Sequence, residues 1–265
     1  MNTYSWNAAD YAQHSQAQQT WARELITTLH LSANEDVLDL GCGDGKVTAE
    51  LAAYVGKGSV LGVDSSSAMV ELARQHYLTS RYPNLTFAQV DARQLAFTGQ
   101  FDVVFSNAAL HWVKDHQPVV DGIYQSLKPG GRILLQMGGK GNAAGILSVV
   151  QEIQTEPPWQ AYFADFDFPY GFYGTEDYET FLHDAGFQIE RLGLIPKDMQ
   201  HAGQRGLEGW IRTTWLPYTD RVPLEKRDDF IHTIAERYLA QVPLDAEGIA
   251  HVAMVRIEAA AVKPG

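Results

Sequence analysis

The first half of the chain alternates compact hydrophobic runs with amphipathic helical stretches, and this alternation constrains the fold more than any other feature. Five runs have the length and hydrophobicity of strands buried on both faces of a parallel sheet. These runs cover residues 36–40, 59–64, 85–91, 101–107 and 132–137. Helical spacing of apolar residues predicts helices over residues 15–30, 46–55, 66–79 and 116–127. Strands and helices in alternation predict a doubly wound α/β architecture.

The pattern changes after the fifth run. LKPGG (127–131) predicts a helix end and a turn before that run, and residues 138–175, rich in aromatics, Gly and Pro, read as an insertion upon the α/β layer. Further elements are expected as a helix over 175–187, a strand over 187–195, a largely helical segment over 205–241 and a strand over 251–262. The expected divisions are an N-terminal helix at 1–30, a core at 31–204, a helical cap at 205–241 and a final strand at 242–265.

The loop after the first run predicts a ligand site. VLDLGCGDGKVT (37–48) places three glycines between a strand and a helix, so a ligand can approach the backbone beside the helix N-terminus. Asp64 closes the second run, where a carboxylate can accept hydrogen bonds from ribose hydroxyls. The spacing is G-x-G-x-G, whereas dinucleotide binders favour G-x-G-x-x-G. Asp39 and Asp44 make the loop negative, which suits a cationic sulfonium or ammonium group better than a pyrophosphate.

Charge and composition exclude several classes of partner. Twenty Lys and Arg residues against 32 Asp and Glu give a net charge of −12, which argues against nucleic acid as a partner. The sequence has no run of eighteen apolar residues and no signal-peptide pattern at its start, so no membrane span is expected. A single cysteine, Cys42, fits a cytoplasmic protein, and no cluster has metal-ligand spacing, so no metal is expected.

The chain resembles the class I S-adenosylmethionine-dependent methyltransferases. The resemblance rests on VLDLGCGDG (37–45), LGVDSSSAM (61–69), VDARQL (90–95), FDVVFSNAALHW (101–112) and LKPGGRILL (127–135), in the order of the family. It implies a Rossmann-like seven-stranded sheet whose last strand is antiparallel, a helical cap near the C-terminal strands, and S-adenosylmethionine as cofactor.

The resemblance also implies which residues contact each part of the cofactor. These are Gly41, Cys42 and Gly43 at the methionine part, Asp64 at the ribose, Ser65 and Met69 near the adenosine, Asp91 and Ala92 at the adenine, and Asn107 and Ala108 beneath the sulfonium. Three of them have a structural alternative: Asp91 as a helix N-cap, Met69 as a core residue and Cys42 as a small buried loop residue.

The N-terminal stretch YAQHSQAQQTW (11–21) is similar to the lid of a subset of this superfamily. That subset includes trans-aconitate, juvenile-hormone acid and malonyl-carrier-protein methyltransferases, so the resemblance implies ester formation on a carboxylate. It also implies that Tyr11 and Gln18 close over the cofactor, with simple helix packing as the alternative. Three other interpretations stay open. The acceptor is an amine or a carbon nucleophile of a natural product, the chain is an NAD-dependent oxidoreductase, or it is a non-catalytic cofactor-binding or interaction subunit.

Acceptor contacts are expected after the fourth run, within NAALHW (107–112). A carboxylate acceptor is anionic at neutral pH and needs no general base, whereas an alcohol needs one. His111 is the candidate catalytic residue there, as a base or as a hydrogen-bond donor to a carboxylate, and Trp112 lies beside it. A structural histidine is the alternative. The expected acceptor is a small molecule, and the protein is expected to be a monomer or a homodimer.

A second group of candidates lies in GWIRTTWLPY (209–218), inside the expected cap. Arg212 is a candidate catalytic residue because its guanidinium can pair with a carboxylate through two hydrogen bonds. The candidate substrate-binding aromatics are Trp210, Trp215 and Tyr218, together with Tyr170 and Tyr173 of the FPYGFYG stretch. The alternative is an aromatic core with a local salt bridge.

Overall fold

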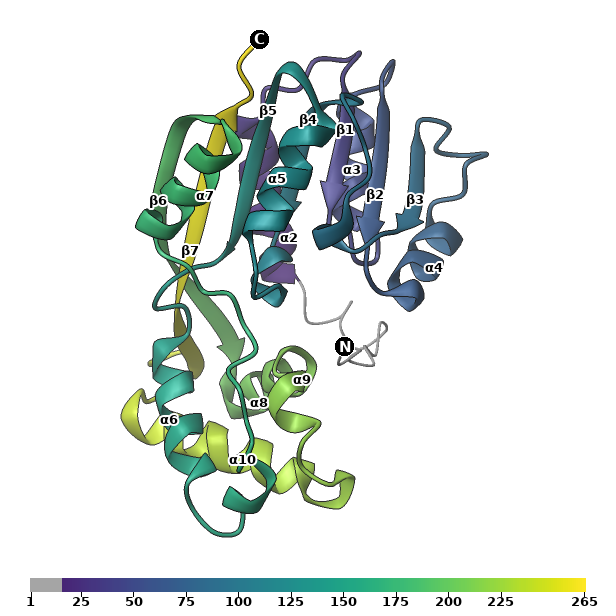
Figure 1. Cartoon of the computed structure of the whole chain (residues 1–265). Coiled ribbons are helices and arrows are strands. Elements are labelled where there is room, and N and C mark those ends of the chain that lie inside the picture. Colours follow the sequence, from purple (N-terminus) through teal and green to yellow (C-terminus); the bar gives the residue numbers. More distant parts are fainter. Residues whose placement is uncertain (1–15) are drawn as a thin grey trace. The chain divides into compact units, whose positions relative to one another are not determined.

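A computed structural model describes residues 16–265, with side chains from Trp21 onward (Figure 1). The described residues form one seven-stranded sheet with the strand order β3-β2-β1-β4-β5-β7-β6. The strands are β1 (Asp36–Leu40), β2 (Ser59–Asp64), β3 (Leu85–Gln89), β4 (Phe101–Asn107), β5 (Leu127–Gly138), β6 (Gln188–Ala202) and β7 (Ile249–Val262). Strands β1 to β5 pair in parallel, and β7 runs antiparallel to β5. The predicted fold class is therefore confirmed.

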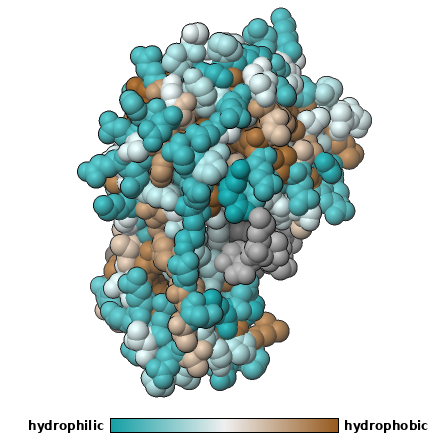
Figure 2. Space-filling model, in the orientation of Figure 1, coloured by the Kyte–Doolittle hydropathy of each residue, from teal (hydrophilic) through white to brown (hydrophobic). Residues whose placement is uncertain are grey.

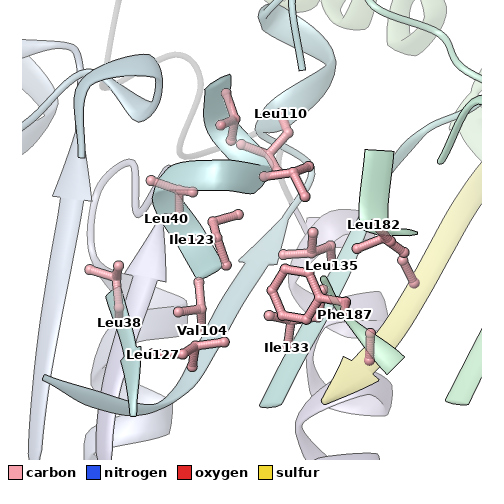
Figure 3. Packing of buried hydrophobic residues seen from close by; sticks show 14 of the residues in the cluster. Leu38, Leu40, Val104, Leu110, Ile123, Leu127, Ile133, Leu135, Leu182 and Phe187 are labelled. Carbon is pink, nitrogen blue, oxygen red and sulfur yellow. The ribbon is translucent and has the colours of Figure 1, made fainter. Parts of the chain in front are cut away.

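Helices cover both faces of the sheet, because the strands bury side chains on both faces. Val37 of β1 packs in one hydrophobic cluster, whereas Leu38 and Leu40 pack in the other, which is why β1 carries apolar residues at neighbouring positions. The first cluster is lined by α2 (Gln16–Thr28), α3 (Lys46–Tyr54) and α4 (Ser67–His76). The second is lined by α5 (Gln117–Ser126) and α7 (Thr175–Ala185), as Figure 3 shows for its central residues.

The chain forms two compact units. The core unit contains residues 16–140, Tyr170–Ile195 and Arg256–Gly265, and the second unit contains Gly141–Pro169 and Pro196–Val255. The helices of the second unit are α6 (Ala144–Gln154), α8 (Gly203–Thr214), α9 (Leu216–Thr219) and α10 (Leu224–Gln241). Helices α8 to α10 confirm the helical segment expected between the last two strands, whereas α6 was not predicted.

One predicted element differs in form. LKPGG was expected as a turn before a strand, yet β5 already begins at Leu127, which pairs with Phe101 of β4. The register shifts between Phe101 and Val103, and Gly130 has a φ of 76°. The stretch is therefore an irregular start of the strand, because the glycine lets the backbone deviate without leaving the sheet.

The strand order fixes where a ligand can bind. β1 lies between β2 and β4, so the connections after β1 and β4 leave the sheet in opposite directions. In open α/β sheets the crevice for ligands lies at this point, outside the carboxyl ends of the strands. The residues that follow β1, β2 and β4 are therefore the candidates for ligand contacts.

Helices in the described part of the chain are too short or too polar to cross a membrane. On the face shown in Figure 2, hydrophilic residues predominate, and hydrophobic ones occur in smaller groups. This surface agrees with a composition that is 45% hydrophobic and 20% charged.

Candidate functional site

The loop after β1 has a backbone that glycine makes possible. Gly41, Gly43 and Gly45 have φ values of 81°, 53° and 82°, a region that side chains disfavour. The Gly41 amide donates to the Val63 carbonyl at 2.7 Å, and a Cβ on Gly41 would lie 2.1 Å from the Cβ of Ala109. The loop is thus packed between the ends of β2 and β4. A Cβ on Gly43, in contrast, would meet nothing within 4 Å, so the loop has one open side.

Asp64 is fixed against this loop by backbone hydrogen bonds. Its Oδ2 accepts from the Gly43 amide at 3.0 Å and its Oδ1 from the Ser66 amide at 2.8 Å. An ionised carboxylate has about four acceptor sites, so both oxygens keep capacity for further donors. Burial raises the pKa of Asp64 above its usual range, although these backbone bonds oppose the shift. The open side at Gly43 and the spare acceptor capacity fit the ribose of a nucleoside.

Asp39 is a second acid beneath the loop, and it is almost completely buried, at 2% exposed. The Thr48 hydroxyl donates to its Oδ2 at 2.7 Å. Burial raises the pKa of Asp39 to about 7, and the charge of Asp64 adds to the shift. Two carboxyl groups with raised pKa values lie under one loop, and a bound cation would stabilise their ionised forms. The loop therefore fits a cationic ligand such as a sulfonium.

The residues expected at the adenosine lie after β2 and β3. Met69 is buried in α4, as its core alternative supposes, while Ser65 is exposed just before that helix. Asp91 caps a short 3₁₀ turn through the Arg93 amide at 2.9 Å, and its pKa is lowered by the Arg93 side chain. Ala92 begins that turn and is half-buried. The capping alternative for Asp91 is thus present, and contact of these four residues with a cofactor stays a prediction.

The chain leaves β4 through a strained residue. Ala108 has a φ of 55°, which is uncommon for a residue with a side chain, and its amide donates to the Gln136 carbonyl of β5 at 2.8 Å. Just before it, the Ser106 hydroxyl donates to the Leu40 carbonyl of β1 at 2.6 Å. These bonds hold the half-buried Asn107 and Ala108 at the switch point of the sheet.

His111 lies in a short 3₁₀ turn, Leu110–Trp112, that Leu110 anchors in the core (Figure 3). The Gly138 amide of β5 points at His111 Nδ1 from 3.5 Å, so Nδ1 carries the lone pair and the ring hydrogen sits on Nε2. Burial lowers the pKa of His111 well below its usual range, and the positive charge of Arg256 lowers it further. His111 is therefore a neutral hydrogen-bond donor.

Two of the expected aromatics join this turn within the core unit. The Tyr170 ring lies edge-on to Trp112, with centroids 5.0 Å apart, and stacks on Phe172 at an interplanar angle of 3°. The Tyr173 hydroxyl donates to the Lys114 carbonyl. The structure thus brings Tyr170 and Tyr173 to the segment that carries His111 and Trp112. Their contact with an acceptor stays a prediction.

A buried pair that no sequence motif indicates, His116 and Tyr178, holds the same turn. His116, 1% exposed, lies with Nε2 at 2.9 Å from the carbonyls of both Leu110 and Val113. The Tyr178 hydroxyl lies 2.7 Å from His116 Nδ1 and 3.1 Å from the Met137 sulfur. Two carbonyls near Nε2 place the ring hydrogen there, so Nδ1 accepts from Tyr178. Burial lowers the pKa of His116, which keeps this arrangement neutral.

The aromatics of GWIRTTWLPY are buried inside the second unit. Trp210 and Trp215 meet edge-on with centroids 5.5 Å apart, and Tyr218 packs 5.6 Å from Trp215. Tyr218 also contacts Phe166, at 4.6 Å. Arg212 lies exposed on α8. The aromatic-core alternative thus describes how these rings pack, and their role with Arg212 in acceptor binding stays a prediction.

Three remaining candidates complete the set. Tyr11 lies outside the described residues, as does the side chain of Gln18 in α2. Cys42 is buried in the glycine loop, and burial raises the pKa of its thiol, so it is no activated nucleophile. Among residues 16–265, no group of three or more His, Cys, Asp or Glu side chains is arranged to hold a metal ion.

A doubly wound sheet with a glycine loop after its first strand and acids at its strand ends has the arrangement that binds nucleosides in open α/β enzymes. A family profile described as a methyltransferase domain matches residues 37–131. An uncharacterised methyltransferase of Schizosaccharomyces pombe is 32% identical over 217 residues, which cover 74% of this chain and 77% of that protein. A trans-aconitate 2-methyltransferase of Methylobacterium nodulans is 28% identical over 92% of both chains.

A solved structure agrees with these relatives. Phosphoethanolamine N-methyltransferase 2 of Haemonchus contortus, in complex with S-adenosyl-L-methionine, superimposes with a TM-score of 0.63 at 21% identity. That alignment covers 97% of this chain and 57% of the other. The chain belongs to the class I S-adenosylmethionine-dependent methyltransferases, and its cofactor is S-adenosylmethionine.

Proposed function

We propose that this enzyme transfers the methyl group of S-adenosylmethionine to a carboxylate oxygen of a small organic acid, forming a methyl ester. The observation that carries the proposal is that the His111 ring is neutral and carries its hydrogen on Nε2. A histidine with a lowered pKa and its hydrogen on Nε2 donates a hydrogen bond to an anionic oxygen. It is poorly suited to remove a proton from an alcohol, because its only free ring position already carries one.

The chemistry of a carboxylate acceptor needs no such base. Its pKa lies near 4, so the nucleophile is already deprotonated at neutral pH. When bound, S-adenosylmethionine supplies an electrophilic methyl group on a positively charged sulfur. An oxygen lone pair forms the new O–C bond while the C–S bond electrons go to sulfur, and no proton moves. Catalysis then depends on alignment and charge placement, which the turn at Leu110–Trp112 and the acids under the glycine loop serve.

The relatives support the same acceptor class. Several bacterial relatives about 28% identical over more than nine-tenths of this chain are named trans-aconitate 2-methyltransferases. The solved structure named above is an amine methyltransferase, and at 21% identity it supports the fold alone. An amine or carbon acceptor is therefore the competing outcome of the test.

The proposed site has two parts. The cofactor contacts are the residues implied by the family motifs, from Gly41 to Ala108, with Asp64 at the ribose. In the core unit the proposed acceptor contacts are His111, Trp112, Tyr170 and Tyr173. A role in acceptor binding for Arg212, Trp210, Trp215 and Tyr218 of the second unit is a separate proposal, which rests on the sequence alone. We further propose that the enzyme acts in the cytoplasm.

A methyl-transfer screen tests the function. The purified protein is incubated with methyl-labelled S-adenosylmethionine and a panel of small mono- and polycarboxylic acids, amines and phenols. We expect label in a carboxylic acid, released by mild alkali as methanol because an ester hydrolyses there. The Asp64→Ala variant, which weakens cofactor binding, should lose the same product. Alkali-stable label on an amine or on carbon would overturn the carboxylate proposal.

A further inference from the structure

The turn that carries His111 is short. It is one 3₁₀ turn, Leu110–Trp112, between β4 and α5, and its N-cap residue, Ala109, has no capping side chain. Two main-chain hydrogen bonds, of 3.1 and 2.9 Å, close it. Turns of this kind have poorer hydrogen-bond geometry than α-helices. The direction of the His111 ring therefore depends on contacts that come from outside the turn.

The imidazole of His116 spans the two ends of this turn. Its Nε2 lies 2.9 Å from the Leu110 carbonyl oxygen and 2.9 Å from that of Val113, so one N–H is shared between the residues on either side of His111 and Trp112. The ring is 1% exposed, so water does not compete for the two carbonyls. Removing this nitrogen would take the donor away from both carbonyls and would allow the turn to shift.

The segment Tyr170–Tyr173 packs against the same ring, within the core unit. The Gly171 amide donates to the His111 carbonyl at 2.9 Å. A Cβ on Gly171 would lie 2.3 Å from the Val113 carbonyl oxygen and 3.0 Å from His116 Nε2, so glycine is what allows this approach. The position of the His116 ring therefore sets how the His111 turn lies and how closely the aromatic segment packs on it.

Tyr178 determines which nitrogen of His116 carries the hydrogen. It lies on α7, which packs against α5 on one face of the sheet (Figure 1). Its side chain is fully buried, and its hydroxyl lies 2.7 Å from His116 Nδ1. Carbonyl oxygens only accept, so Nε2 donates to them and Nδ1 accepts from the hydroxyl. A ring with its hydrogen on Nδ1 would instead direct a lone pair at both carbonyls and would no longer hold the turn.

We propose that His116 is a positioning residue for methyl transfer, because it sets the turn so that the Nε2–H of His111 points at the acceptor oxygen. Tyr178 keeps His116 in the tautomer that this requires. The inference rests on the proposed function, in which His111 contacts the acceptor. His116 acts through His111 and needs no contact of its own with either substrate.

A double-mutant cycle in kcat tests this role. The assay uses methyl-labelled S-adenosylmethionine and the compound of the screening panel that the wild type labels fastest. His116→Phe keeps a ring without its nitrogens, and we expect kcat to fall about tenfold to hundredfold, the range for a misplaced aligning group. In a His111→Phe background the same change should lower kcat less than about threefold, because the group that His116 positions is gone. The Kd for S-adenosylmethionine should stay within about threefold in each variant.

Rescue and a matched control separate positioning from a merely structural role. His116→Gln keeps an N–H donor near the position of Nε2 and should recover part of the loss. Tyr178→Phe removes the donor to Nδ1 and should lower kcat less than His116→Phe does. Ser126→Ala is the control, because it removes a buried hydrogen bond, 2.6 Å long, to the Gly122 carbonyl at the other end of α5. It should leave kcat unchanged.

The inference is overturned if a folded His116→Phe keeps the wild-type kcat, or if it lowers kcat by the same factor with and without His111. It is also overturned if His116→Gln recovers nothing, or if Ser126→Ala causes an equal loss. Should His116→Phe not fold, Tyr178→Phe takes its place in the cycle, and equal factors in both backgrounds then refute the inference. Failure of the proposed function looks different, since the label on the wild-type product would then be stable to mild alkali.

Discussion

Replacing Asp39 by Asn should change how cofactor affinity depends on pH. Burial and the neighbouring Asp64 raise the pKa of Asp39 from 3.8 to about 7. The bound sulfonium is positive, so it favours the ionised carboxylate and should bring this pKa down again. Cofactor binding must then expel a proton wherever Asp39 is protonated, and affinity should fall as the pH falls through 7.

The size of the effect follows from the pKa. At pH 7 about half of the free enzyme carries the proton, and at pH 6 about ten in eleven molecules do. Wild-type affinity should therefore weaken about fivefold from pH 7 to pH 6, roughly 1 kcal/mol. Asparagine keeps an oxygen for the Thr48 hydroxyl but cannot ionise, so the variant should bind more weakly at pH 7 and show a flatter profile.

Calorimetric titration of both proteins at several pH values measures this. The cofactor's own ammonium titrates identically in the two titrations, so the difference between them isolates Asp39. Stability without cofactor gives a second readout. The folded pKa of Asp39 is raised, so its contribution to the free energy of unfolding is fully present below about pH 4 and is lost as pH rises through 7. This contribution is at most ~4 kcal/mol. The variant should therefore melt higher at pH 8, and identical pH profiles for both proteins would refute the reasoning.

Three further changes have direct readouts. Gly41→Ala should abolish cofactor binding and lower Tm, because the φ of residue 41 is 81° and the new Cβ would lie 2.1 Å from that of Ala109. An unchanged calorimetric titration with S-adenosylmethionine would contradict the packing of the loop. Arg212→Ala should raise KM for the acceptor at constant cofactor Kd; unaltered kinetics would remove it from the acceptor site. The pKa of His251 is raised mainly by Asp245 and then by Asp198 of β6. The ion pairs of His251 therefore stabilise the fold below the pKa that the histidine has in the unfolded chain, and this stabilisation is lost as pH rises through its folded pKa. In melts across pH 5 to 9, Asp245→Asn should flatten this dependence, and a slope equal to the wild type would argue against the ion pairs.

The strands and the glycine loop could be predicted from the sequence because their signals are local. A strand buried on both faces reads as a hydrophobic run, and the runs at 36–40, 59–64 and 101–107 match β1, β2 and β4 residue for residue. Helix α6 escaped prediction because its signals conflict. Its N-cap, Ala143, sits at a φ of 51° with no capping side chain, and ILSVV reads as readily as a strand.

The proposed acceptor site depends on pairing between distant segments, for which a single sequence carries no signal. The hydrogen of His111 is placed by an amide 27 residues away, at Gly138. Tyr178 reaches His116 across 62 residues, and Arg256 comes to lie opposite Gly138 only through the antiparallel register of β7 on β5. Residue types at these positions look ordinary until the sheet brings them together.

The charge under the glycine loop suits the proposed reaction. The acids Asp39 and Asp64 lie at the ends of β1 and β2, next to the loop that we expect to hold the sulfonium. Methyl transfer from a sulfonium to a carboxylate destroys one charge of each sign, and buried surroundings favour that loss. After transfer the acids face a neutral thioether and their pKa values should rise again. The products are then held less tightly than the reactants, so the groups that align the reaction also favour product release.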